Sequence, residues 1–371
     1  MNRKLLFIAF SNLQAYTGGA HAMILDLKII QEVFGHENVV PYIIEPVQVK
    51  RSFADKVTRF KEILCGYFGG LTQHHLNSIL SIVKKKHITD VFIDSSQLGL
   101  VAQKIHLLFP NVKIYCFFQN IEYDFIRSQV FDAKDYKHFF QVFLAKHNET
   151  SACKYCDKVI VLNSRDGNRL RAVYHRVPDF FRPVWLEDEK LPPMNTDKYV
   201  DYDKPLNALF VGSYFFGNVV GLKKFCQNVL PHTNINLQIV GSGMQALIDE
   251  LGEMKQISIA HDVPDLTPYY ENADFIVLPI TTGGGMKVKT AEALKYGKFI
   301  IGTPEALEGY EVNEDVACVC KTTDEFINAI NSYNKQKKFN LPSRSLFKSR
   351  YSKEASIHIY QNLLFPNENN H

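Results

Sequence analysis

The stretch that decides the fold class is residues 276–303, which read IVLPITTGGGMKVKTAEALKYGKFIIGT. It starts inside an apolar run, Phe275–Pro279, that is typical of a buried strand. A glycine triplet follows, then a helical pattern that ends at Gly297, and then a second apolar run, Phe299–Ile301. A strand, a glycine loop, a helix and a strand form a βαβ unit. The stretch therefore predicts an α/β fold with a parallel sheet.

The glycine triplet, Gly283–Gly285, has the properties of an anion-binding loop. Backbone N–H groups at the start of a helix point at a bound phosphate, and the helix dipole favours negative charge there by about 0.3–1 kcal/mol. Lys287 and Lys289 add positive charge. Glycine-rich turns are common in α/β proteins, so the triplet alone indicates little. Glu292 is more informative, because a carboxylate in an apolar helical stretch needs a hydroxyl or a cation as its partner.

Composition limits the class of protein. The chain has 371 residues, enough for two domains, and its 46% hydrophobic and 22% charged residues are typical of a globular protein. Its apolar runs have the length of strands, so we expect no transmembrane helix, and Met1–Phe10 reads as a first strand and not as a signal peptide. The seven cysteines include one CxxC pair, Cys153 and Cys156, without a second pair at zinc-site spacing. We therefore expect reduced thiols, a cytoplasmic protein and no metal site.

The first half of the chain carries the positive charge. Residues 1–180 have a net charge of +7, from 23 Lys and Arg against 16 Asp and Glu, whereas the remainder has −4. Residues 50–68 repeat an apolar side chain at helical spacing among lysines and arginines: Phe53, Val57, Phe60, Leu64 and Phe68. Two interpretations are open. Either this helix lies on an anionic membrane surface, or its apolar face packs on the domain core.

Glycines or polar residues follow three of the strands predicted in the first half. They are, in chain order, Gly18 with Gly19, then Asp94, then Asn120 with Glu122. Open parallel sheets bind ligands just past the carboxyl ends of their strands. Asn120 and Glu122 are therefore candidate site residues, and helix capping is the alternative explanation for them.

Repeated strand–glycine–helix units predict two doubly wound domains. Proline-interrupted residues 181–205 read as a linker between a domain of residues 1–180 and a second of residues 206–350. In the second domain the strands end at glycines, among them Gly212 and Gly241. Because the carboxyl ends of parallel strands share one sheet edge, these glycines and the triplet should line one side of a cleft.

These segments resemble the GT-B-fold glycosyltransferases, specifically the retaining glycosyltransferase family 4. The resemblance rests on the order and spacing of LNALFVGS at 206–213, LQIVGSG at 237–243, HDVPDLTPYYENADFIVLP at 261–279 and GGGMKVKTAEALKYGKFIIGTPEALEGYE at 283–311. The first half is similar more loosely, through Gly18-Gly19, QNIEYD at 119–124 and CDKVIVLNSRD at 156–166. The resemblance implies two Rossmann-like domains facing a central cleft, with the last helix, 353–364, packing back on the N-terminal, acceptor-binding domain.

The resemblance also implies a nucleotide-sugar donor site in the second domain. Glu292 would accept hydrogen bonds from the ribose hydroxyls, the backbone at Gly284–Met286 would hold the phosphates, and residues around Val263 would flank the base. The implied donor residues are Gly212, Ser213, Gly241, Gly243, Asp262, Val263, Thr282, Gly283, Gly284, Gly285, Met286, Lys287 and Glu292. Those on the sugar and acceptor side are Gly18, Gly19, Asp94, Gln119 and Asn120, and the implied catalytic residues are Lys287, Glu292, Asn120 and Glu122.

Two positions depart from the family pattern. Relatives often carry a glutamate where this chain has Gly284, eight residues before Glu292, and a histidine where it has Gln119. The missing glutamate usually contacts the donor sugar, so backbone amides would take more of that role. Glutamine can donate and accept a hydrogen bond but does not titrate near neutral pH.

The implied reaction is a retaining, metal-independent transfer of a hexose from a UDP- or GDP-linked sugar to a saccharide or polyprenyl-linked acceptor, in bacterial surface-polysaccharide biosynthesis. We expect no cofactor besides the nucleotide-sugar substrate, and no nucleic acid partner. The protein would work in the cytoplasm, as a peripheral membrane protein on the inner face of the cytoplasmic membrane if residues 50–68 contact lipid. Two alternatives stay open: a non-catalytic nucleotide-sugar-binding subunit, and a GT-B-fold sugar epimerase.

Overall fold

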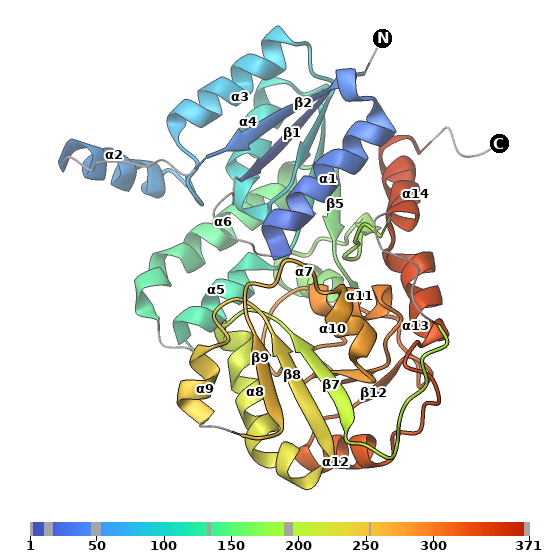
Figure 1. Ribbon diagram of the computed structural model, residues 1–371. Helices are drawn as coiled ribbons and strands as arrows, with labels where there is room; N and C mark the ends of the chain where they lie inside the picture. The colour runs from blue at the N-terminus through green and yellow to red at the C-terminus, as the bar shows by residue number, and fades with distance from the viewer. Residues whose placement is uncertain are drawn as a thin grey trace. The chain divides into compact units, whose positions relative to one another are not determined.

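The computed structural model describes residues 3–10, 18–45, 53–131, 135–188, 196–251 and 254–366. The chain divides into two compact units (Figure 1). Unit 1 comprises residues 1–183 and 356–371, and unit 2 comprises residues 184–355. Within the described residues, each unit holds a six-stranded sheet whose strands pair in parallel. The α/β fold with two doubly wound parallel sheets is therefore confirmed.

Unit 1 alternates strands with helices along the chain. Its elements are β1 Leu5–Phe10, α1 Gly18–Phe34, η1 His36–Asn38, β2 Val39–Ile44, α2 Phe53–Leu64, α3 Gln73–Lys85, β3 Asp90–Ile93, η2 Ser96–Leu98, α4 Gly99–Leu108, β4 Lys113–Phe118, α5 Glu122–Phe131, η3 Tyr136–His138, α6 Phe139–Tyr155, β5 Lys158–Val161, α7 Ser164–Tyr174 and β6 Phe180–Phe181. The strand order is β2-β1-β3-β4-β5-β6. The winding reverses between β1 and β3, and such a switch point is where open α/β sheets bind ligands.

Helices on both faces bury the strands of unit 1, which explains their continuous apolar sequences. Five of the six residues of β1 are at most 1% exposed. The last helix, α14 Lys353–Leu364, starts in unit 2 and contributes its residues from Ser356 onward to unit 1. There the buried Tyr360 packs on Phe92 of β3, with ring centroids 6.0 Å apart, and its hydroxyl accepts a hydrogen bond from Arg182 at 3.3 Å.

Unit 2 repeats the same architecture. Its elements are β7 Leu206–Val211, α8 Phe216–Asn228, η4 Leu230–His232, β8 Ile235–Val240, α9 Ala246–Leu251, β9 Ile257–Ala260, α10 Thr267–Asn272, β10 Phe275–Leu278, α11 Val288–Lys295, β11 Ile300–Gly302, β12 Ala317–Val319, α12 Thr323–Asn331, α13 Leu341–Leu346 and the π-helix η5 Phe347–Tyr351. The strand order is β12-β11-β10-β7-β8-β9, so the switch point lies between β10 and β7.

The structure corrects three boundaries expected from the sequence. The helix after the glycine triplet begins at Val288, so Met286 precedes it, because the triplet ends in a left-handed residue, Gly285, with φ 58°. The helix predicted over residues 50–68 ends at Leu64, and Phe68 lies beyond it in the core. Residues 343–350, expected to separate two helices, are themselves helical.

Unit 2 begins at Val184, inside residues 181–205 that were expected to link the domains. Trp185 and Leu186 are buried, at 2% and 5% exposure. The buried carboxylate of Asp188 pairs with the side chains of Arg344 and Lys348. These contacts attach the first part of the segment to the helices at the end of unit 2.

Candidate functional site

The carboxyl ends of three strands bring the predicted donor residues of unit 2 to one sheet edge. Because β7 lies between β10 and β8, Gly212 after β7 has Gly241 on one side and the glycine triplet on the other. The backbones approach closely there. A Cβ on Gly241 would lie 1.9 Å from the carbonyl oxygen of Gly212, so only glycine fits at Gly241. Because Gly212 has no side chain, it leaves room for the ammonium group of Lys289, which reaches this edge from α11.

The side chain of Lys287 stabilises the glycine loop. Its ammonium group donates to the carbonyl oxygens of Gly284 and Gly285, each at 3.2 Å, and pairs with the carboxylate of Glu305 at 2.6 Å. The hydroxyl of Tyr310 donates to the backbone carbonyl of Lys287 at 2.8 Å. The charge of Lys287 is therefore balanced by Glu305, and its contacts fix the shape of the loop.

Lys289, two residues further on, has a different environment. Its ammonium group bonds to the side-chain oxygen of Asn218 and lies 5.0 Å from the ring centroid of Phe210. A Cβ on Gly212 would lie only 3.0 Å from this nitrogen. No ion pair of Lys289 occurs in the part of the chain that the structure describes. Burial lowers the pKa of Lys289 to about 7, so an anion arriving at this edge would stabilise its charged form.

Glu292 follows Lys289 by three residues, which places both on one face of α11. Its carboxylate accepts a long hydrogen bond, 3.5 Å, from the hydroxyl of Tyr270, whose ring stacks on Tyr296 with centroids 4.1 Å apart. Burial raises the pKa of Glu292, while the nearby Lys295 and Lys289 lower it. This carboxylate keeps acceptor capacity for hydroxyl groups of a ligand.

The other predicted donor residues lie in the loops that follow β7 to β10. They are Ser213, Gly243, Asp262, Val263 and Thr282. Asp262 is in the left-handed region, with φ 52°, and its side chain contacts His261 at 3.1 Å. Tyr214 and Phe215 in the β7–α8 turn and Phe216, the first residue of α8, are 39–60% exposed and were not predicted from the sequence as site residues. Three consecutive aromatic residues just past a strand end are a signal that was available.

In unit 1, Asp94 and Gln119 meet at the carboxyl ends of the neighbouring strands β3 and β4. The amide of Gln119 donates to the carbonyl oxygen of Asp94 at 3.3 Å and to its Oδ2 at 3.2 Å. The other carboxylate oxygen, Oδ1, is buried and has no hydrogen-bond partner among the described residues. Burial raises the pKa of Asp94 to about 8. Gly18 and Gly19 open α1, and residues 11–17 before them lie outside the described residues.

Glu149, inside α6, caps α5 from a distance in sequence. Its carboxylate accepts the backbone N–H groups of Glu122 at 2.7 Å and Tyr123 at 3.2 Å. The hydroxyls of Ser96 and Tyr174 donate to the same carboxylate. Burial raises the pKa of Glu149 to about 7. No role was predicted for Glu149 from the sequence, although a glutamate among small residues was a usable signal.

Glu122 lines a cavity of about 450 Å³ in unit 1, between α2, α5 and α6. Three amide side chains and three aromatic rings also line the cavity: Gln97, Gln129, Gln141, Tyr67, Phe68 and Phe125. Burial raises the pKa of Glu122, while hydrogen bonds from Gln97 and Asn120 lower it. Because Glu149 accepts the N–H groups that open α5, the side chain of Glu122 is not needed as a cap and can face the cavity. Carboxylates, amides and aromatic rings together suit a polyhydroxylated ligand.

Each unit thus gathers its predicted residues at the carboxyl edge of its own sheet. Comparison with solved structures identifies the fold. The apo form of the lipopolysaccharide outer core galactosyltransferase WaaB is similar with a TM-score of 0.69 and 14% identity, over 98% of this chain and 99% of that chain. Anabaena Alr3699/HepE, solved in complex with UDP and glucose, is similar with a TM-score of 0.63 and 11% identity, over 98% and 99%. The chain has the GT-B fold.

Sequence comparison then identifies the second unit. A family model described as Glycosyl transferases group 1 matches residues 205–335, which include all the donor residues named above. An uncharacterized 44.6 kDa protein in the cps region of Klebsiella pneumoniae is 22% identical over 191 residues, 47% of this chain. The match spans about half the length of that protein, 46%. Residues 205–335 of unit 2 are therefore similar to the glycosyl transferases group 1, in agreement with the resemblance to GT-B glycosyltransferases.

Proposed function

We propose that the protein is a glycosyltransferase that moves a hexose from a nucleotide-diphosphate sugar to a saccharide or lipid-linked oligosaccharide. The observation that carries the proposal is the convergence of the glycine loop, Lys289 and Glu292 at the switch point of unit 2. An ammonium group that forms no ion pair with a described residue suits a diphosphate, and a nearby carboxylate suits the hydroxyls of a ribose. The UDP found in the HepE complex supports a UDP-linked donor.

In the proposed reaction, Lys289 and the N–H groups that open α11 stabilise the leaving diphosphate. The bond between the anomeric carbon and the phosphate oxygen breaks while the acceptor oxygen bonds to that carbon on the same face. The acceptor hydroxyl gives its proton to the departing phosphate oxygen. Positive charge at this oxygen does the work that a divalent cation does in other enzymes, so the transfer needs no metal. Bonding on the same face makes the transfer retaining. Lys287, paired with Glu305, acts by holding the glycine loop in shape.

The acceptor belongs to unit 1 in this proposal. The cavity that holds Glu122 and the pair Asp94–Gln119 supply polar groups for a saccharide. Exposed Val57, Phe60 and Leu64 on α2 support a peripheral contact with the cytoplasmic membrane, and the side chain of Phe53 lies outside the described residues. In the described part of the chain, no helix combines the length and apolar character needed to cross a bilayer. The cps-region relative supports a role in bacterial surface-polysaccharide biosynthesis.

A donor screen tests the proposal. Thermal unfolding is measured with UDP-, GDP-, ADP- and dTDP-sugars, and a donor present at 100 times its Kd should add about 2.7 kcal/mol of stability. Release of the nucleoside diphosphate from that donor, with and without acceptor saccharides, then measures catalysis. Glu292→Ala should weaken donor binding at least about tenfold, because hydrogen bonds to a charged group contribute about 1.5–3 kcal/mol. Binding without any turnover would favour the non-catalytic subunit, and no binding by any donor would refute the proposal.

A further inference from the structure

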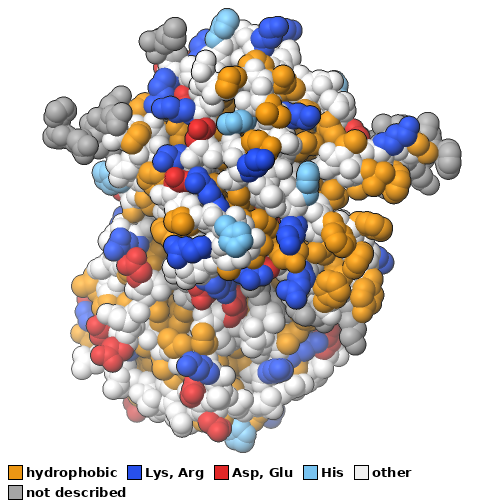
Figure 2. Space-filling view, turned by 180° about the vertical axis from the view of Figure 1, so that it is seen from behind, with side chains coloured by type: hydrophobic (Ala, Val, Ile, Leu, Met, Phe, Trp, Pro, Cys, Tyr) orange, Lys and Arg blue, Asp and Glu red, His pale blue; other side chains and the backbone are white. Residues whose placement is uncertain are grey.

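A cluster of exposed aromatic side chains, here called the aromatic ridge, covers the hairpin between α5 and α6. Its described members are Phe131, Tyr136, Phe139, Phe140 and Phe143, which are between 40% and 74% exposed. Phe139 stands at its centre, with ring centroids 6.3, 6.0 and 5.4 Å from those of Phe131, Phe140 and Phe143. Figure 2 shows hydrophobic side chains gathered on one flank of the molecule, with Lys and Arg beside them. An exposed apolar cluster of this size marks an interaction surface.

The charges beside the aromatic ridge indicate the chemistry of its partner. Lys137 in η3 and Lys146 on α6 are exposed, and the ammonium group of Lys146 lies 5.2 Å from the ring centroid of Tyr123. Among the described residues, Asp135 is the carboxylate nearest to Lys137 in sequence. Its carboxylate lies 3.5 Å from the ring of His138. Aromatic rings that stand among cations match the headgroup layer of an anionic bilayer, where rings sit at the interface and each cation near the surface adds about 1 kcal/mol.

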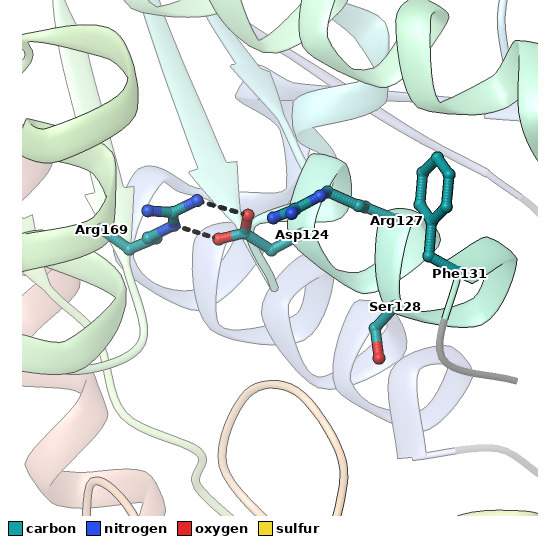
Figure 3. Close-up of a pocket in the computed structure, with 5 residues that line it drawn as sticks. All are labelled: Asp124, Arg127, Ser128, Phe131 and Arg169. Carbon is teal, nitrogen blue, oxygen red and sulfur yellow. Dashed lines mark hydrogen bonds and ion pairs between the residues drawn. The ribbon is translucent and has the colours of Figure 1, made fainter.

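A polar pocket of about 300 Å³ adjoins the aromatic ridge and shares Phe131 with it (Figure 3). Arg169 of α7 donates hydrogen bonds to both carboxylate oxygens of Asp124, from Nε and, at 2.8 Å, from Nη2. Arg127 also lines the pocket, is exposed, and makes no hydrogen bond or ion pair with any residue that the structure describes. In Figure 3 the carboxylate of Asp124 stands between the two guanidinium groups. The pocket therefore has a net positive charge, because Asp124 balances only one of the two arginines. The planar guanidinium group of Arg127 has the geometry to bind a phosphate.

We propose that the α5–α6 hairpin binds the surface of an anionic phospholipid bilayer, with the aromatic ridge in the headgroup layer and a lipid phosphate on Arg127. Two observations carry this: a cluster of rings that remain 40–74% exposed, and an arginine without an ion pair among the described residues, in a pocket that one of those rings helps to form. The proposal does not depend on the donor site, and it concerns a surface separate from the apolar face of α2. It places unit 1 against the lipid from which a lipid-linked acceptor would come.

Vesicle co-sedimentation of the full chain tests the proposal. Vesicles of phosphatidylcholine alone are compared with vesicles that also contain phosphatidylglycerol. The double variant Phe140→Ser, Phe143→Ser removes two ring faces and keeps Phe139, and it should lower partitioning to the mixed vesicles about tenfold or more. The matched control is Leu107→Ser with Leu108→Ser, two residues at the end of α4 that are 60% and 58% exposed, which should leave partitioning unchanged.

Arg127→Gln tests the phosphate contact separately. Because Lys137 and Lys146 remain, this variant should lose about fivefold of the preference for phosphatidylglycerol, whereas Arg127→Lys should keep most of it. Several results would overturn the proposal: unchanged partitioning of the ridge variant, an equal loss in the leucine control, or a loss confined to Phe60→Ser with Leu64→Ser on α2. A ridge variant that turns a dimer into a monomer and still binds vesicles would assign the surface to a second copy of the chain, which also overturns it.

Discussion

Binding of a nucleotide sugar should take up a proton on Lys289. With a pKa of about 7, this side chain is about half protonated at pH 7 in the free protein. A diphosphate beside the ammonium group favours its charged form, so the pKa rises well above 7 in the complex. A nucleotide sugar carries the same two phosphate charges throughout the neutral pH range. Any change in affinity over that range therefore comes from the protein.

The size of the effect follows from the pKa of Lys289. Proton uptake should be about 0.5 per donor bound at pH 7 and about 0.9 at pH 8. The affinity should fall by less than about twofold between pH 6 and pH 7, and by about fivefold between pH 7 and pH 8. Glu292 gives the opposite trend, because loss of its charge at low pH weakens binding there. The two groups are thus separated by the sign of the pH dependence.

Calorimetric titration with UDP-glucose, in buffers of different ionisation enthalpy, measures the uptake directly. Lys289→Met should abolish both the proton uptake and the fall in affinity above pH 7. Lys287→Met is the matched control: it removes the lysine two residues earlier, at the end of the glycine loop, which is already paired with Glu305, so the pH dependence should persist. A Lys289→Met protein that still takes up a proton on binding, or a wild type whose affinity is flat above pH 7, would refute the assignment.

Three further predictions concern stability, each measured by urea unfolding. Lys289→Met should stabilise the free protein, because burial of the charged lysine lowers its pKa from 10.5 to about 7 and so reduces the free energy of unfolding. This loss of stability is largest below about pH 7 and disappears as the pH rises through 10.5. Glu149→Ala should destabilise by about 2–4 kcal/mol, because it leaves the N–H groups that open α5 without acceptors. Gly241→Ala should destabilise by about 3 kcal/mol or more, because its Cβ would collide with the carbonyl of Gly212, and donor binding should be lost with it.

The strands of the fold could be predicted from the sequence because their pattern is local. Helices cover both faces of each sheet, so a strand such as β7 is an apolar run, interrupted only by Asn207 and followed by the glycine that was predicted to end it, Gly212. The start of α11 could not be predicted in this way. Met286 and Lys287 fit the helical pattern, but the pairing of Lys287 with Glu305 and the hydroxyl of Tyr310 hold them in the loop. Those partners lie in later segments.

The same limit applies to the two lysines of the candidate site. Lys287 and Lys289 look equivalent in the sequence, and the family resemblance favoured Lys287. They differ only through partners far along the chain. Glu305, 18 residues away, balances Lys287, whereas the contact of Lys289 is with the neutral Asn218, 71 residues away. The capping of α5 could not be predicted from the sequence for the same reason. Glu149 accepts a hydrogen bond from a backbone N–H group 27 residues away.

A lowered pKa does not by itself identify a ligand site in this protein, as Lys298 shows. Burial also lowers the pKa of Lys298 to about 7, and its side chain is only 2% exposed. Its ammonium group, however, donates to the carbonyl oxygens of Ala273 at 2.8 Å and Lys338 at 3.0 Å, so its burial is compensated by the fold. Lys289 has the neutral amide oxygen of Asn218 and an aromatic face instead, at the edge where the glycine loop ends. An apolar side chain there would make the free protein more stable, so the lysine is best explained by the anion that we propose it binds.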